Sequence, residues 1–126
     1  LRIIAAHFGL LKRSRQQQAE AIIAVMQARK SLPTLLLGDL NEWRVGARSS
    51  LNMLDTHFGR HAPVASFPSR LPFLALDRII ANREGLIEQI AAHDSPLARV
   101  ASDHLPIKTR LLLEAKVDPL ASILPR

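Results

Sequence analysis

Cysteine is absent from the 126-residue sequence, and so is tyrosine. The lack of cysteine excludes disulfide bonds and thiolate metal sites, but it does not separate a cytosolic from an exported protein; of the two compartments we favour the cytoplasm. Aromatic residues make up only 4% of the chain, so no stacking platform for single-stranded nucleic acid is evident. No apolar run approaches the ~20 residues that a membrane-spanning helix needs. A transmembrane segment is therefore not expected.

The overall composition is that of a folded globular domain. Hydrophobic residues make up 48% of the chain and charged residues 22%, which leaves no room for a long disordered tail. A length of 126 residues suits one domain with a moderate core. The net charge is +6, and 13 of the 17 basic residues are arginine, whose planar fork matches phosphate oxygens. This balance favours a polyanionic partner, although scattered arginines are more often an ordinary solvated surface.

Short apolar runs predict the strands of the fold. The chain opens directly on such a run and not on a leader with a charged start, so we expect it to be a piece of a longer protein. A turn at Asn82 to Gly85 predicts a hairpin between the third and fourth strands. The predicted strands are residues 1–6, 34–37, 76–81, 86–91 and 105–113.

One long amphipathic helix is predicted between the first two strands. Over residues 14–30 the apolar side chains of Ala19, Ile22, Ile23 and Met26 recur at helical spacing, and Pro33 then stops the helix. A short helix is expected from Ser49 or Ser50 to about residue 56, followed by a loop over residues 57–73. Residues 115–126 are expected to form a loosely held tail. The order of elements predicts an α/β fold with a mixed β-sheet flanked by helices.

Polar side chains gather where the predicted strands begin or end. If the first two strands run opposite to the later two within one mixed sheet, these positions share one edge, where open α/β sheets usually bind ligands. Neighbouring carboxylates repel each other, and a divalent cation relieves that repulsion. Oxygen ligands without cysteine favour Mg²⁺, or Mn²⁺, over zinc. The residues concerned are His7, Asp39, Asn41, Asp77, Asp103 and His104.

Five short segments together resemble the ordered motifs of the endonuclease/exonuclease/phosphatase superfamily, which includes type I deoxyribonuclease. They are His7-Phe8-Gly9-Leu10, Arg15-x-x-Gln18, Gly38-Asp39-Leu40-Asn41, Leu76-Asp77-Arg78-Ile79 and Ser102-Asp103-His104-Leu105-Pro106-Ile107. The stretch Ser66-Phe67-Pro68-Ser69-Arg70 is similar to uncharacterised bacterial members. The resemblance implies half of a four-layer α/β/β/α sandwich, with residues 1–114 as the C-terminal portion of the domain.

The resemblance also implies roles for the polar residues. Asp39 would orient or deprotonate the attacking water, and Asn41 would hold the phosphate or that same aspartate. His104 would contact the scissile phosphoryl oxygens, while Asp77 would fix an imidazole tautomer. His7 would serve as a phosphate contact or general acid. The implied metal ligands are Asp103 and Asp39.

The implied activity is divalent-metal-dependent hydrolysis of a phosphodiester or phosphomonoester. The basic balance favours nucleic acid slightly, and a lipid or inositol phosphate fits nearly as well. A noncatalytic phosphate-binding fragment is the alternative, because the family's N-terminal half contributes a metal-binding glutamate and an asparagine without counterparts here. Members usually have threonine before the first histidine, whereas Ala5 and Ala6 precede His7. Either the missing half or a second copy of the chain is expected to cover the exposed sheet.

Each site residue also has an ordinary structural interpretation. An aspartate after glycine at a strand end, such as Asp39, is commonly a turn residue. Asp103 and His104 would then belong to an Asx-type turn, and Asp77 with Arg78 would form a surface ion pair worth less than ~1 kcal/mol. The joint occurrence of all the motifs favours the catalytic interpretation.

Overall fold

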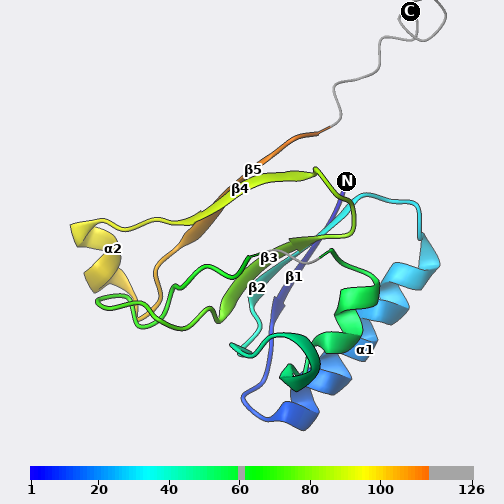
Figure 1. Ribbon diagram of the computed structural model, residues 1–126, viewed down its shortest axis with the longest axis horizontal. Helices are drawn as coiled ribbons and strands as arrows, with labels where there is room; N and C mark the ends of the chain where they lie inside the picture. Colours follow the sequence, from blue (N-terminus) through cyan, green and yellow to red (C-terminus); the bar gives the residue numbers. More distant parts are fainter. Residues whose placement is uncertain (60–61, 114–126) are drawn as a thin grey trace, which may run out of the picture.

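The structure is a computed structural model that describes residues 1–59 and 62–113. The chain forms three layers: the helix α1 (Lys12–Ala28), a first β-sheet and a second β-sheet (Figure 1). Helix α1 and a 3₁₀ helix, Asn52–Thr56, pack on one face of the first sheet, and the second sheet covers part of the other face. The expected α/β class is confirmed. The predicted tail, residues 115–126, lies outside the described residues.

The first sheet has the order β1-β2-β3 and contains both strand directions. Strand β1 (Arg2–His7) runs parallel to β2 (Thr34–Asp39), and β3 (Asp77–Ala81) runs antiparallel to β2. The ends of β1 and β2 therefore share one edge with the start of β3. The polar residues at these strand ends can therefore meet, as the sequence analysis expected for strands of opposite direction.

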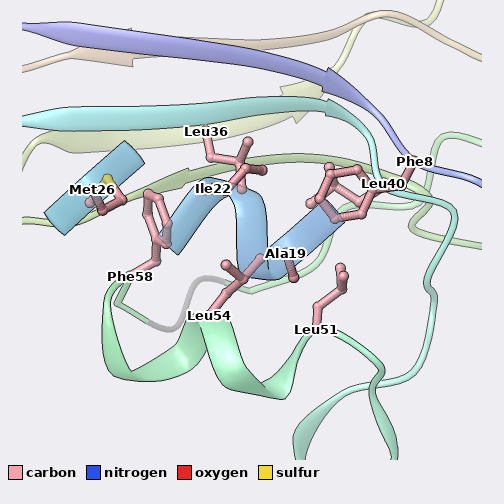
Figure 2. Close-up of a cluster of buried hydrophobic side chains, with 9 residues drawn as sticks. All are labelled: Phe8, Ala19, Ile22, Met26, Leu36, Leu40, Leu51, Leu54 and Phe58. Carbon is pink, nitrogen blue, oxygen red and sulfur yellow. The ribbon is translucent and has the colours of Figure 1, made fainter. Parts of the chain in front are cut away.

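The main hydrophobic core lies between helix α1 and the first sheet. The predicted stripe is correct: Ala19, Ile22 and Met26 are buried, and they pack against Leu36 at the centre of β2 (Figure 2). Burial of each large side chain contributes roughly 1.5–3 kcal/mol. Leu54 of the 3₁₀ helix and the flanking residues Leu51 and Phe58 close this core from below, and Phe8 and Leu40 close it next to the strand ends.

A second core joins the two sheets. Strand β4 (Ile87–Ala92) pairs antiparallel with β5 (Ile107–Leu111), and this pair packs over Leu35, Ile79 and Ala81 of the first sheet. Because successive residues of a strand point to opposite faces, Leu36 faces α1 while Leu35 and Leu37 face the second sheet. The central strand is thus covered on both faces.

The predicted hairpin between residues 76–81 and 86–91 is wrong, and the strands form two sheets instead of one, although the first of them is mixed as predicted. Strand β3 pairs with β2, and β4 pairs with β5 in a separate sheet. The turn itself exists, with Gly85 at a φ of +81°. A tight turn leaves open whether the next strand pairs with the last or crosses over its face, and here crossing buries Leu86, Ile87 and Ile90 on the second core.

Several boundaries differ from the predicted ones. Helix α1 begins at Lys12 and ends at Ala28, the last strand is shorter than residues 105–113, and the short helix is of the 3₁₀ type. A helix α2 (Pro96–Ala101) was not predicted. Its signal was present, because Ser95 caps it by accepting a hydrogen bond from the Ala98 amide and proline occupies the first turn.

Candidate active site

Three of the candidate side chains are held side by side by strand register. His7 ends β1 opposite Asp39 at the end of β2, and Asp39 in turn lies opposite Asp77 at the start of β3. Cross-strand partners share a face of the sheet, so all three side chains lie on the face that the second sheet partly covers. The geometry of the strand pairing therefore brings an imidazole and two carboxylates together.

His104 reaches this group from the loop that precedes β5. Its Nδ1 lies 2.6 Å from Oδ2 of Asp77, and its Nε2 lies 3.7 Å from Oδ2 of Asp39. Nε2 of His7 lies 3.6 Å from that same Asp39 oxygen. The imidazole of His104 also contacts the Phe67 ring, with 4.9 Å between the ring centroids. The site is thus built at the junction of the two sheets.

The charges around His104 favour its protonated form. Partial burial by itself would lower the pKa of His104, but the hydrogen bond to Asp77 and the negative charges of Asp77, Asp39 and Asp103 raise it above its ordinary value of 6.5. When Asp77 is ionised, the imidazole Nδ1–H is the donor of the short hydrogen bond. An imidazolium in this position has its Nε2–H available to an anionic group.

Ser66 is a site residue that belongs to one of the sequence motifs but had no predicted role. Its side chain is buried, and its hydroxyl donates to Oδ2 of Asp77 at 2.5 Å. Its carbonyl accepts a hydrogen bond from the Leu105 amide at 2.8 Å. Ser66 therefore ties the loop before β3 to the loop that carries His104, and it orients the carboxylate that orients that histidine.

Asn41 shapes the loop that follows β2. Its φ is +50°, a left-handed conformation that asparagine tolerates better than most residues. Its backbone amide donates to Oδ1 of Asp39 at 3.0 Å, and its side-chain amide donates to the carbonyl of Phe8 at 2.6 Å. Asn41 thereby holds Asp39 through the backbone and joins the loops after β1 and β2 through its side chain.

Gly38 permits the close approach of β1 and β2 at the site. Its φ is +138°, and a Cβ at this position would lie 1.8 Å from the carbonyl oxygen of Ala6. Only glycine fits next to Asp39 at this distance. The first position of the Gly-Asp-x-Asn motif therefore requires glycine on steric grounds.

Asp103 is placed differently from the other candidates. Its side chain is exposed, and its backbone carbonyl accepts a hydrogen bond from the Ser69 amide at 2.8 Å. Its charge raises the pKa of His104. Among the described residues, the one group with metal-ligand spacing consists of Asp39, Asp77 and His104, whose ligand atoms lie within 4.8 Å of one another. Asp103 is close to this group but not part of it.

The cluster borders a hollow at the junction of the sheets. Its volume is about 420 Å³, and its lining includes Asp77, His104, Gly38 and the apolar residues Leu37 and Ile107. The hollow is large enough to admit a small charged group beside the Asp77 carboxylate and the His104 imidazole. His7, whose side chain is 78% exposed, lies on the solvent side of Asp39.

Comparison with known proteins shows the family of the chain. Residues 6–104 match the Endonuclease/Exonuclease/phosphatase family. The uncharacterized protein YbhP of Escherichia coli (strain K12) is 32% identical over 121 residues, covering 90% of this chain and 47% of YbhP. The chain belongs to the endonuclease/exonuclease/phosphatase family, and it spans about half the length of the curated relatives it matches.

Solved structures share the fold. The mannosyl-6-phosphatase Bt3783 of Bacteroides thetaiotaomicron VPI-5482 is similar with a TM-score of 0.69 at 18% identity, over 88% of this chain and 51% of that one. A functionally unknown conserved protein from Enterococcus faecalis V583 is similar with a TM-score of 0.67 at 19% identity, over 86% and 48% of the two chains. Within the described residues, the structure contains no helix of the length and hydropathy that spanning a membrane requires.

Proposed function

We propose that the protein to which this chain belongs hydrolyses a phosphate ester by in-line attack of water on phosphorus. The observation that carries the proposal is the linked series Asp77–His104–Asp39 at the adjoining strand ends, with separations of 2.6 and 3.7 Å. Family membership supports it, because members are nucleases and phosphatases. The substrate is a phosphodiester or a phosphomonoester.

In this proposal His104 binds the scissile phosphoryl group. Asp77 accepts a hydrogen bond from the Nδ1–H of His104, and in the protonated imidazole the Nε2–H remains free to donate to a phosphoryl oxygen. The raised pKa of His104 supports this role, since a protonated imidazole stabilises the negative charge that develops on those oxygens. Asp77 acts through His104, and Ser66 acts through Asp77.

Asp39 orients and deprotonates the attacking water in this proposal. Its Oδ1 is occupied by the Asn41 amide, while its Oδ2 faces both imidazoles at 3.6 and 3.7 Å. Oδ2 is therefore the oxygen placed to accept the proton of a water molecule. His7, which is exposed beside Oδ2, contacts the phosphate or protonates the leaving group. Asn41 positions Asp39.

We further propose that the site uses Mg²⁺ or Mn²⁺, held by Asp39 and Asp103. The donor set fits such an ion, because Mg²⁺ is usually held by one or two carboxylates together with water and substrate oxygens. Asp39 belongs to the group with metal-ligand spacing, which supports a cation beside it, and the exposed Asp103 directly precedes His104 of that group. When bound, the ion would neutralise charge on the phosphoryl group and lower the pKa of water.

Two substrate classes follow from different observations. The net charge of +6 favours nucleic acid, as a polyanion. The structural similarity to a mannosyl-6-phosphatase favours a small phosphomonoester such as a sugar phosphate. A lipid or inositol phosphate is the remaining alternative.

We also propose that residues 1–114 form the C-terminal portion of a domain, since the matched relatives are about twice as long.

Hydrolysis assays with Mg²⁺ on plasmid DNA, bis-p-nitrophenyl phosphate and p-nitrophenyl phosphate test the activity. We expect Asp39→Asn and His104→Ala to reduce turnover about 100-fold or more, each with the circular dichroism of the wild type. EDTA should abolish turnover and added Mg²⁺ should restore it. Full activity in either variant would contradict the assigned roles, and phosphate binding without turnover would favour the noncatalytic alternative.

A further inference from the structure

Glu42 is a buried carboxylate that the proposed chemistry does not use. It follows Asn41 directly, is 1% exposed, and lies on the α1 side of the loop after β2. Its carboxylate accepts hydrogen bonds from the Ser50 hydroxyl at 2.6 Å, the Ser50 amide at 2.9 Å and the Arg44 amide at 3.0 Å. Burial by itself would raise the pKa of Glu42, but these hydrogen bonds and the charge of Arg15 lower it. The group is a fully satisfied, ionised carboxylate.

Arg15 connects this carboxylate to the loop that follows His7. Its guanidinium is buried and lies 3.4 Å from Oε2 of Glu42, and its Nε donates to the Ser50 hydroxyl at 2.8 Å. Its remaining nitrogen donates to the carbonyls of Gly9 and Leu10. A lysine has one nitrogen in place of this fork and does not reach all these acceptors. Arg15 thus joins α1, the loop after β1 and the loop after β2.

Arg78 connects the same residue to the start of β3. It donates to the backbone carbonyl of Glu42 at 2.7 Å and to the carbonyl of Ala75 at 3.0 Å. Its neighbour in the chain is Asp77, the partner of His104. The Glu42 charge partly offsets the lowering of the Arg78 pKa by burial. The Glu42 carboxylate is therefore tied through Arg15 to α1 and the loop after β1, and its backbone carbonyl is tied to the start of β3.

We infer that Glu42 is a positioning residue, which holds the three strand-end segments carrying His7, Asp39 and Asp77 in their mutual geometry through Arg15 and Arg78. This inference rests on the proposed function. Buried ion pairs commonly add little net stability, because desolvation offsets their attraction, whereas they do restrict geometry. Three backbone amides next to the site report that geometry. The Phe8 amide donates to the Asp39 carbonyl, the Leu40 amide to the Leu76 carbonyl, and the Asn41 amide to the Asp39 carboxylate.

The test compares Glu42→Gln with Asn82→Ala. Asn82 is a matched control because it also bridges two segments, accepting from the Thr34 amide at 2.7 Å and donating to the Leu32 carbonyl at 2.8 Å, but at the opposite end of the sheet. We expect both substitutions to lower the unfolding temperature. Only Glu42→Gln should speed hydrogen exchange of the Phe8, Leu40 and Asn41 amides, by about tenfold. It should also shift the imidazole ¹⁵N resonances of His7 and His104.

Kinetics supply the second arm of the test. We expect Glu42→Gln to lower kcat about 10-fold or more while changing KM less, whereas Asn82→Ala keeps kcat. If the wild-type chain hydrolyses none of the three substrates, the noncatalytic alternative is favoured over the proposed function, while the exchange and imidazole measurements still decide this inference. Should Glu42→Gln fail to fold, Ser50→Ala removes one hydrogen bond from the same carboxylate and takes its place. Site amides and kcat that respond to Glu42→Gln no more than to Asn82→Ala would overturn the inference.

Discussion

At the scale of single residues, His104 determines how the candidate site is charged. It lies in the segment that leads into the second sheet, and its partner Asp77 begins a strand of the first. The hydrogen bond and charge of Asp77 raise the pKa of His104. The protonation of the site is thus set by a contact between residues 27 positions apart.

We expect Asp77→Asn to lower the pKa of His104. The substitution removes the largest favourable contribution, so the imidazole should lose its proton at a lower pH than in the wild type. NMR titration of the His104 ring protons without added metal measures this directly. His57, which lies beside Met26 and Asn82 at the opposite end of the first sheet, provides the internal control. An unchanged His104 titration would mean that Asp77 does not orient the ring in solution.

The lowered pKa of Glu42 makes the stability of the fold depend on pH. Its pKa in the folded chain lies below the ordinary value of 4.5, so the unfolded chain binds a proton first as the pH falls. The stability contributed by the ionised carboxylate is therefore full above pH 4.5 and is lost as the pH falls through the folded-state pKa. We expect Glu42→Gln to lower the free energy of unfolding at pH 7, with a difference that shrinks on acidification. Urea unfolding between about pH 7 and pH 3 measures it; a pH-independent difference would contradict this explanation.

At the scale of elements, the approach of β1 to β2 positions the site. The parallel pair ends in His7 and Asp39, and its two strands come close enough that Gly38 lies against the Ala6 carbonyl. Asn41 and the Phe8 amide then connect the two loops that follow. Small shifts between these strands would separate His7 from Asp39.

Gly38→Ala should therefore be strongly destabilising. The added Cβ would lie 1.8 Å from the Ala6 oxygen, in addition to the strain of a φ of +138°. We expect a loss of more than ~2 kcal/mol in the free energy of unfolding. Gly85→Ala is the matched control, since Gly85 also has positive φ, at +81°, but nothing lies within 4 Å of the new methyl group; about 1 kcal/mol is expected there. Equal effects in denaturant titrations would show that the close strand approach is absent.

At the scale of the whole molecule, β1 is an open edge of the first sheet. It pairs only with β2 among the described strands, and Leu1 and Ile3 are 51% and 58% exposed on it. A flat apolar edge strand is a surface that other chains tend to cover. The proposal that a further segment or a second copy covers this face follows from that exposure.

We expect the 126-residue chain by itself to self-associate in solution. Light scattering after size exclusion should give a mass above 14.0 kDa, and Ile3→Lys should shift it toward the monomer by placing a charge on the edge. Val25→Lys, which changes a half-exposed apolar residue on α1, is the control and should leave the mass unchanged. A wild-type chain that is monomeric at high concentration would contradict the prediction.

The sequence by itself determined the features that depend on local periodicity. The helical spacing of Ala19, Ile22 and Met26 defined the buried face of α1, and the positions of His7 and Asp39 at the ends of apolar runs placed them on one sheet edge. These features depend on residues close to one another in the sequence. The spacing of apolar residues along a helix or strand determines its buried face in any fold.

Only the tertiary structure decided which strands pair and which distant groups meet. The turn at Gly85 is compatible with a hairpin, yet β4 crosses to a second sheet because its apolar side chains cover Leu35 and Ile79. The meeting of His104 with Asp77 follows from that packing, whereas Arg15 and Arg78 meet Glu42 because α1 and the loop after β2 pack against the first sheet. Such contacts depend on burial between elements far apart in the chain, which no local pattern encodes.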